Sequence, residues 1–225
     1  MLSVARPVSA PWVRPVQPER AVQVVPGHNR WHPGIPAVAE LISGGSVRLE
    51  CEAVRDLDEP LLCGPLSIVG AEPGDVIVVD ILAIGRTDGR YAGAGHPGVI
   101  GCAPAEGVAG ADPEGAVLGL VQPGAAFEEI AASAVRSSAR GRAVAGCAIA
   151  PLTPGSRILL PVHARGARLS VGDLRFPSSR GADCHRTGLA GWIDLRVNLT
   201  KRGIERFMVS GPVLMPDPDH RHPPR

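Results

Sequence analysis

The sequence has few aromatic residues, no long apolar run and no excess of either charge. Aromatic residues make up 3% of the 225 residues, with one Tyr and three Phe, which are too few for a surface that stacks nucleic-acid bases. The formal net charge is +1, from 23 basic and 22 acidic residues, and the Arg residues are scattered. These features argue against nucleic acid as a partner. No run is long enough for a membrane-spanning helix, so no membrane partner is expected.

Paired cysteines are also missing. The chain has five Cys, an odd number, with wide spacing and no Cys-x-x-Cys pair: Cys51, Cys63, Cys102, Cys147 and Cys184. This pattern favours reduced thiols over a disulfide framework or a structural zinc site. Residues 1–26 are repeatedly interrupted by proline and lack the apolar stretch of a signal peptide. We therefore expect a cytoplasmic protein.

Glycine and proline are abundant, with 28 and 23 residues, and the apolar fraction of 44% is typical of a globular protein. This composition predicts short strands joined by tight turns, without long helices. We expect a Pro-rich N-terminal arm over 1–26, a single β domain over 27–212 and a disordered tail over 213–225. The arm is either loose or lies across a partner subunit.

Two turn-and-strand patterns support the β prediction. Glu72–Asp75 has Pro second and Gly third, which predicts a type II turn because Gly supplies the positive φ. The run Val76–Leu82 that follows is apolar on both faces and indicates a buried sheet. The same order of turn and strand returns at Thr153–Ser156 and 157–162. The repetition indicates two related sheets or half-domains.

Alternating patterns predict two further strands, and one pattern predicts a helix. Apolar and polar residues alternate over Ser46–Ala53 and over Trp192–Leu199, which is typical of half-buried strands. A helix is predicted over Phe127–Arg140, where acidic residues come early, basic residues come late and apolar residues follow helical spacing: Phe127, Ile130, Ala131, Ala134 and Val135.

Four motif-like stretches follow one another along the chain. They are His28-Asn29-Arg30-Trp31-His32-Pro33; Gly64-Pro65 followed by Gly70–Val76; His96–Gly101 with Ala103-Pro104; and Leu169–Leu174 followed by Gly191–Val197. In this order and combination the stretches resemble the acetamidase/formamidase family. The resemblance covers most of residues 28–200.

This resemblance implies a fold and an activity. The fold is mainly β, an acetamidase/formamidase-like β-sandwich/barrel architecture with one or two short helices. The activity is hydrolysis of the C–N bond of a small linear amide to a carboxylate and ammonia, in a homo-oligomer. A divalent metal such as zinc is implied as the cofactor, since it would activate water and polarise the carbonyl.

The sequence departs from the family's pattern at four places. The "GDxH" motif ends in Arg175, whose guanidinium has no lone pair for a metal. Ser178–Ala182 replaces the acidic "QGDGE" stretch, Pro60 stands where "HPLTGP" has its His, and residues 142–148 lack the carboxylate of "RENGGNxD". Several expected ligands are therefore absent, and whether a metal is bound stays open.

Four residues are candidate catalytic groups. Asp173 would orient water or a metal, or else cap backbone amides in a turn at the end of a strand. His96, in a Gly-rich loop, would act as an acid or base, or else have no role. Asp183 and His185 would replace lost ligands or form an acid–base pair, or else lie on the surface. If a metal is bound, Asp173 and His96 are its expected ligands.

Three further residues are candidates for substrate binding. His28 and His32 flank Trp31 and would contact substrate, or else hold the N-terminal motif through hydrogen bonds. Arg175 would bind a carboxylate or an anionic substrate, or else be solvated.

Three functional hypotheses follow. The leading one is an amidase-like hydrolase that acts on a small-molecule substrate. The second is a non-hydrolytic enzyme, such as a cyclase, isomerase or lyase of secondary metabolism, that reuses the same cavity. The third is a catalytically silent homologue that binds or scaffolds an active one.

Overall fold

The computed structural model describes residues 27–53, 59–89, 95–105, 113–138, 152–176 and 188–217. The predicted N-terminal arm, together with Asp183 and His185, lies outside these ranges. The elements in chain order are β1 (Arg30–Trp31), β2 (Ala39–Leu41), β3 (Gly45–Cys51), β4 (Leu62–Ile68), β5 (Val76–Arg86), β6 (His96–Gly101), α1 (Ala125–Ser133), β7 (Val135–Arg136), β8 (Arg157–Pro161), β9 (Leu169–Arg175), β10 (Gly191–Thr200), α3 (Gly203–Phe207) and β11 (Val213–Met215).

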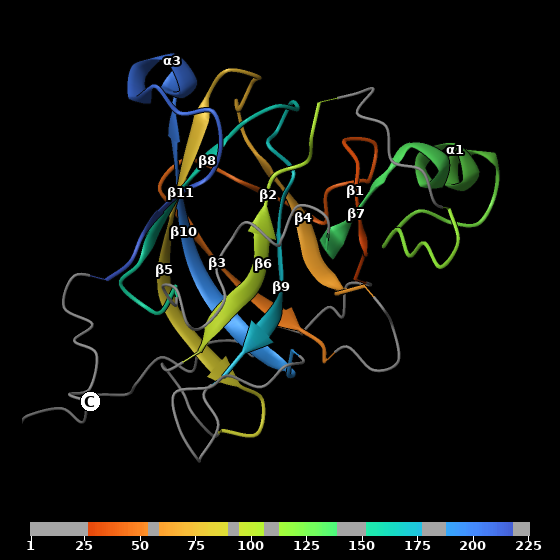
Figure 1. Cartoon of the computed structure of the whole chain (residues 1–225), viewed down its shortest axis with the longest axis horizontal. Coiled ribbons are helices and arrows are strands. Elements are labelled where there is room, and N and C mark those ends of the chain that lie inside the picture. Colours follow the sequence, from red (N-terminus) through yellow and green to blue (C-terminus); the bar gives the residue numbers. More distant parts are fainter. Residues whose placement is uncertain are drawn as a thin grey trace, which may run out of the picture.

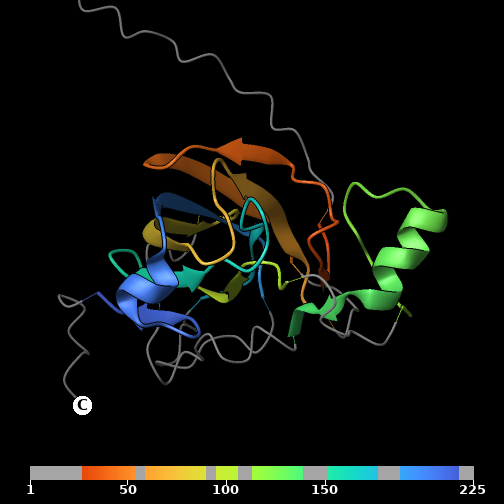
Figure 2. The same ribbon diagram turned by 90° about the horizontal axis from the view of Figure 1, so that it is seen from above.

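The described strands form three sheets, and the two larger ones make a β-sandwich (Figure 1). The five-stranded sheet has the order β11-β8-β5-β10-β3, and the four-stranded sheet has the order β2-β4-β9-β6. Neighbouring strands are antiparallel except for the β2–β4 pair. The small β1–β7 sheet carries α1 beside it, and α1 and α3 lie at opposite ends of the molecule in both views (Figure 2). The expected mainly β fold is confirmed.

The main core fills the space between the two larger sheets. Its buried side chains come from both, for example Ile77, Ile81 and Leu195 from the five-stranded sheet and Leu169 and Val171 from the four-stranded sheet. Each fully buried aliphatic side chain of this kind contributes about 1.5–3 kcal/mol by leaving water. The four-stranded sheet also has a second covered face, because Trp31 packs there against Leu62 and Val99. The four-stranded sheet is therefore buried on both faces over part of its area.

Both predicted turns are present. Asp75 N donates to Glu72 O at 3.1 Å and Ser156 N donates to Thr153 O at 3.0 Å, while Gly74 and Gly155 have φ values of 96° and 92°. The strands after these turns, β5 and β8, pair with each other inside one sheet. The expectation of two related sheets or half-domains is therefore wrong.

Strand β5 is buried mainly on its inner face. Ile77, Val79 and Ile81 belong to the main core, whereas Leu82 on the outer face is 40% exposed. The alternating pattern at Ser46–Ala53 gives β3, with Leu49 and Cys51 facing the core as predicted.

The predicted helix is too long at its C-terminal end. Helix α1 ends at Ser133, and Ala134 is already extended, with φ −78° and ψ 145°. Val135 and Arg136 then pair with Trp31 and Arg30 as strand β7. The apolar residues follow helical spacing up to Val135, but this strand pairing ends the helix earlier. The pairing provides backbone hydrogen-bond partners for the N-terminal motif.

Two further expectations are corrected. His96 does not lie in a loop, because it begins strand β6, which pairs along its length with β9. The expected disordered tail starts too early, because Val213–Met215 forms β11 and pairs with β8. Residues 218–225 lie outside the described ranges.

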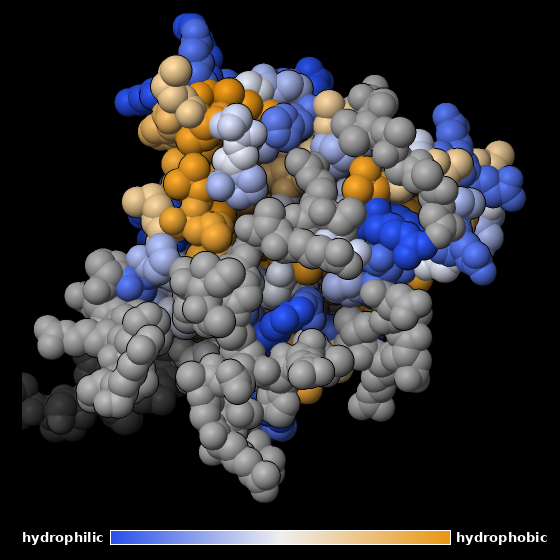
Figure 3. Space-filling model, viewed as in Figure 1, coloured by the Kyte–Doolittle hydropathy of each residue, from blue (hydrophilic) through white to orange (hydrophobic). Residues whose placement is uncertain are grey.

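Apolar side chains are exposed on α3 and on β11, the edge strand of the five-stranded sheet. Met208 is 88% exposed and Met215 is 48% exposed, with Phe207 and Val213 also exposed nearby in sequence. Figure 3 shows apolar residues gathered over this part of the molecule, at the upper left of the view. No helix in the described part of the chain has both the length and the apolarity needed to cross a bilayer.

Candidate active site

Strands β6 and β9 bring three of the predicted residues together. His96 is the register partner of Arg175 in this antiparallel pair. Arg175 donates from Nε and Nη2 to one carboxylate oxygen of Asp173, Oδ2, at 2.9 and 2.6 Å. The Asp173 side chain is 7% exposed and that of Arg175 is 32% exposed. A nearly buried carboxylate is thus held by a cation that reaches solvent.

The backbone at Asp173 departs from a regular strand. Val171 and Leu174 both face the main core, although residues three apart in a regular strand face opposite sides. The alternation therefore breaks at Gly172 and Asp173, where Asp173 has a φ of 52°. This left-handed conformation is uncommon for a residue other than glycine and is most often adopted by Asn and Asp.

Two glycines give the Asp173 side chain its space. A Cβ on Gly98 would lie 2.3 Å from Asp173 Oδ2 and 2.8 Å from Arg175 Nε. A Cβ on Gly188 would lie 2.6 Å from the other carboxylate oxygen, Oδ1. Both distances are far inside van der Waals contact, so any side chain at either position would displace the ion pair.

His96 is buried next to this ion pair. Its Nδ1 lies 3.1 Å from the Pro97 carbonyl oxygen, which can only accept, so Nδ1 carries the hydrogen and Nε2 carries the lone pair. Burial lowers the pKa of His96 below its ordinary value; the charge of Arg175 adds to this, while the bond to Pro97 and the charge of Asp173 oppose it. The ring is therefore neutral at pH 7.

His28 is engaged on both ring nitrogens. Nδ1 donates to the Arg30 carbonyl oxygen at 2.6 Å, so Nε2 accepts from the Ser170 hydroxyl at 2.9 Å. Burial lowers the pKa of His28 to about 4, and the bond to Arg30 only partly opposes this. These bonds join the N-terminal motif to β9, three residues before Asp173. The structure thus gives His28 a positioning role, and its contact with substrate stays a prediction.

His32 lies at the α1 end of the molecule. Its Nδ1 accepts from Gly34 N at 3.0 Å, and its Nε2 lies 3.2 Å from the Ser133 hydroxyl at the end of α1. The structure does not bring His32 to Asp173. The contacts of His32 instead join the end of α1 to the segment after β1.

The described residues do not fit a metal centre. In the ranges given above, no group of three or more His, Cys, Asp and Glu side chains lies close enough together to hold a metal ion. The two expected ligands, Asp173 and His96, are accompanied by Arg175, whose charge would repel a cation. We therefore derive no step that runs through a metal.

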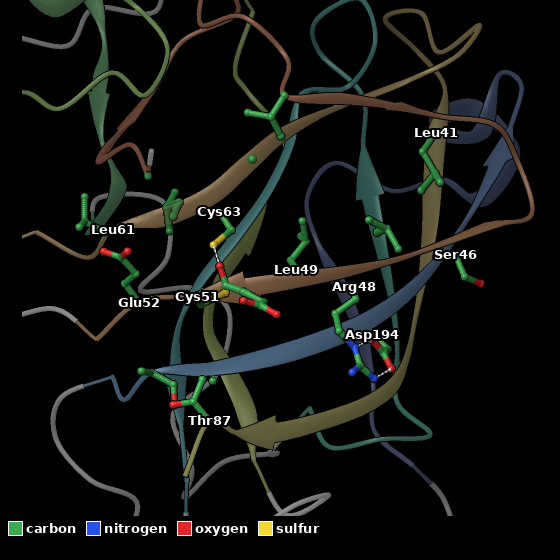
Figure 4. A pocket seen from close by; sticks show the side chains of 18 of the residues that line it. Leu41, Ser46, Arg48, Leu49, Cys51, Glu52, Leu61, Cys63, Thr87 and Asp194 are labelled. Atoms are coloured by element: carbon green, nitrogen blue, oxygen red, sulfur yellow. Dashed lines mark hydrogen bonds and ion pairs between the residues drawn. The ribbon is translucent and has the colours of Figure 1, made fainter. Parts of the chain in front are cut away.

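A groove of about 740 Å³ lies along β3 and β4 (Figure 4). It is lined by parts of β2, β3 and β4 and by the ends of β5 and β10. Neither Asp173 nor His96 lines it, although Leu61 and Leu62, which do, contact Gly172 beside Asp173. The expected cleft beside both residues is not this groove.

Sequence reasoning missed two buried polar residues. Ser170 lies inside the Leu169–Leu174 motif, and its hydroxyl donates to His28 Nε2 at 2.9 Å. The motif does not indicate this long-range hydrogen bond. Glu59 is buried and its carboxylate accepts from Ser137 and Ser138, and from Arg136 at 3.3 Å. Burial raises the pKa of Glu59, but these hydrogen bonds outweigh it and lower the pKa overall. No local sequence pattern around Glu59 predicts these hydrogen bonds, because their donors lie 77 to 79 residues away in the sequence.

The model of the acetamidase/formamidase family matches residues 16–94 and 86–223 of this chain. The chain belongs to this family. It is 30% identical to a formamidase of Methylophilus methylotrophus over 85% of this chain and 68% of that protein. It is also 30% identical to an acetamidase of Mycolicibacterium smegmatis over 86% of this chain and 71% of that protein.

Two solved structures share the fold. A gamma lactamase from Delftia acidovorans is 26% identical, with a TM-score of 0.70 over 85% of this chain and 68% of that one. An acetamidase from Yersinia enterocolitica, 18% identical with a TM-score of 0.53 over 85% of this chain and 68% of that one, supports the fold alone.

The packing at Gly98 gives a first prediction. Gly98→Ala should lower kcat/KM by at least about tenfold, because the new methyl group displaces the Asp173–Arg175 pair and misplaced catalytic groups lose rate steeply. The control is Gly101→Ala on the same strand, where the added Cβ meets Trp31 at 3.4 Å and is tolerated. Equal activity of the two variants at equal thermal stability would contradict the role given to Gly98.

The burial of His28 gives a second prediction. Its pKa is lowered from 6.5 to about 4 on folding, so the unfolded chain binds more protons between these values. Stability is therefore unaffected by His28 above pH 6.5 and falls by roughly 3 kcal/mol as pH falls from 6.5 towards 4, because the unfolded chain takes up the proton first. An NMR titration of the His28 ring should give a midpoint near 4, with half-buried His32 as the internal comparison. A His28 midpoint near 6.5 would show that the ring is not buried as described.

Proposed function

We propose that this protein hydrolyses the C–N bond of a small amide. The relationship to a formamidase and an acetamidase, each 30% identical over most of the chain, carries the proposal. The geometry at β6 and β9 supports it, since Asp173 keeps the Gly-Asp of the family motif in a strained backbone conformation beside a neutral histidine. Strain of this kind is concentrated at functional sites.

Each group has a role in this reaction. Asp173 orients the attacking water and accepts its proton as the oxygen adds to the amide carbonyl carbon. Arg175, partly exposed, provides the positive charge that stabilises the oxyanion of the tetrahedral intermediate. His96 passes the proton that Asp173 took from the water to the amide nitrogen, so that the C–N bond breaks and the tetrahedral intermediate gives a carboxylic acid and an amine or ammonia.

The substrate class is small amides, linear or cyclic. Linear substrates are supported by the names of the formamidase and acetamidase relatives, and a cyclic amide by the name of the gamma lactamase. Of the three hypotheses drawn from the sequence, these comparisons support the hydrolase.

The third prediction tests this function directly. Purified protein should release ammonia from at least one of formamide, acetamide and propionamide, or open 2-pyrrolidinone to its amino acid. Asp173→Asn should lower kcat/KM on that substrate by at least about 100-fold, since a positioned base contributes 10²–10⁴-fold. The control is Asp80→Asn, which removes a carboxylate paired with exposed Arg157 on the other sheet. The proposal fails if no member of the panel is hydrolysed, with or without added divalent metal.

Assembly and location complete the proposal. We propose a homo-oligomer, supported by the exposed apolar side chains of α3 and β11 described above. We also propose a cytoplasmic location, supported by Cys51, Cys63 and Cys102, which are in the reduced form. Light scattering of the purified protein measures its molar mass and so tests whether it is a homo-oligomer.

A further inference from the structure

Two cysteines from different sheets meet at the open edge of the sandwich. Cys51 ends β3 in the five-stranded sheet, and Cys63 lies in β4 of the four-stranded sheet. Cys63 donates to the carbonyl oxygen of Glu50, the residue before Cys51, at 2.6 Å (Figure 4), so its sulfur lies beside Cys51. The Cys51 thiol donates to the Val171 carbonyl oxygen at 3.8 Å. Strands β3 and β4 do not pair with each other in either sheet, so no backbone ladder joins them here.

The two thiols differ in access and in chemistry. Cys63 is half-buried and both residues line the groove, but Cys51 is only 3% exposed and faces the core. The neighbouring Cys63 thiol, followed by burial, raises the pKa of the Cys51 thiol well above its ordinary value. A reagent that enters the groove therefore meets Cys63 first, while Cys51 stays protonated behind it.

We propose that Cys63 is a site of oxidation by hydroperoxides and that Cys51 is its resolving thiol. The Cys63 sulfur attacks the peroxide, which breaks the O–O bond, forms a sulfenic acid and releases water or an alcohol. The Cys51 sulfur then attacks the sulfenic sulfur, an S–S bond forms, and the hydroxyl leaves as water with the Cys51 proton. Each disulfide thus consumes one peroxide as the two-electron oxidant.

The disulfide would join the two sheets covalently at an edge that lacks strand pairing. Residue 62, next to Cys63, pairs with Gly172 on β9, one residue from Asp173, and its backbone bonds to His28. Oxidation at the groove would therefore stiffen the strand on which the N-terminal motif and β9 both rest. In a reducing compartment such a bond is transient and senses the redox state.

Mass spectrometry after peroxide treatment tests this proposal, the fourth prediction. Cleavage after Arg48, Arg55 and Arg86 separates the two cysteines, so the bond appears as peptides 49–55 and 56–86 joined together. The joined pair should form on treatment of the intact protein with hydrogen peroxide, vanish on reduction with dithiothreitol, and raise Tm by about 5 °C or more.

Variants separate the two roles. Cys51→Ser should leave Cys63 without its resolving thiol, so Cys63 gains two or three oxygen atoms instead of forming a bond. Cys63→Ser should leave Cys51 reduced, and the control Cys102→Ser, at another buried cysteine, should leave the joined pair intact. The proposal is overturned if wild-type Cys63 stays reduced or bonds to any cysteine other than Cys51. This result is independent of amide hydrolysis.

Discussion

The site depends on how closely β6 and β9 approach each other at Asp173. The strand pair can hold a carboxylate there only because Gly98 and Gly188 contribute no side chain and because Asp173 adopts a φ of 52°. That conformation turns the strand so that Leu174 returns to the core while the carboxylate stays with Arg175 on the opposite face. The position of the Asp173 carboxylate therefore depends on the packing of Leu174 in the core, on the space at the two glycines and on the ion pair with Arg175.

Arg175 changes the electrostatics of a family motif that ends in histidine. Where a neutral imidazole could bind a metal, a permanent cation instead binds Asp173 and helps to keep His96 neutral. The protein has in this way exchanged a candidate ligand for a fixed positive charge at the same strand position. A fixed charge can stabilise an oxyanion without a bound ion, so amide hydrolysis remains chemically accessible.

The sequence predicted local structure well where a single rule governs it. The Pro-Gly turns and the alternation in β3 and β10 follow from backbone geometry and burial alone, so they were predictable. The end of α1 was not, because Val135 obeys helical spacing but pairs with Trp31, a partner over 100 residues away. The contacts of Glu59 and Ser170 are equally long-range. Asp173, His96 and Arg175 were identified from the family motifs, but their shared strand pair required the register of β6 and β9.

A double-mutant cycle on Asp173 and Arg175 tests most directly whether the ion pair acts as one unit. Asp173→Asn, Arg175→Gln and the double variant would be compared by kcat/KM on the best amide substrate, with folding checked by circular dichroism. The account predicts strong coupling, so that the double variant loses little more activity than the more damaged single variant. If the two losses simply multiply, Asp173 and Arg175 act independently and the pair is not the basis of the site.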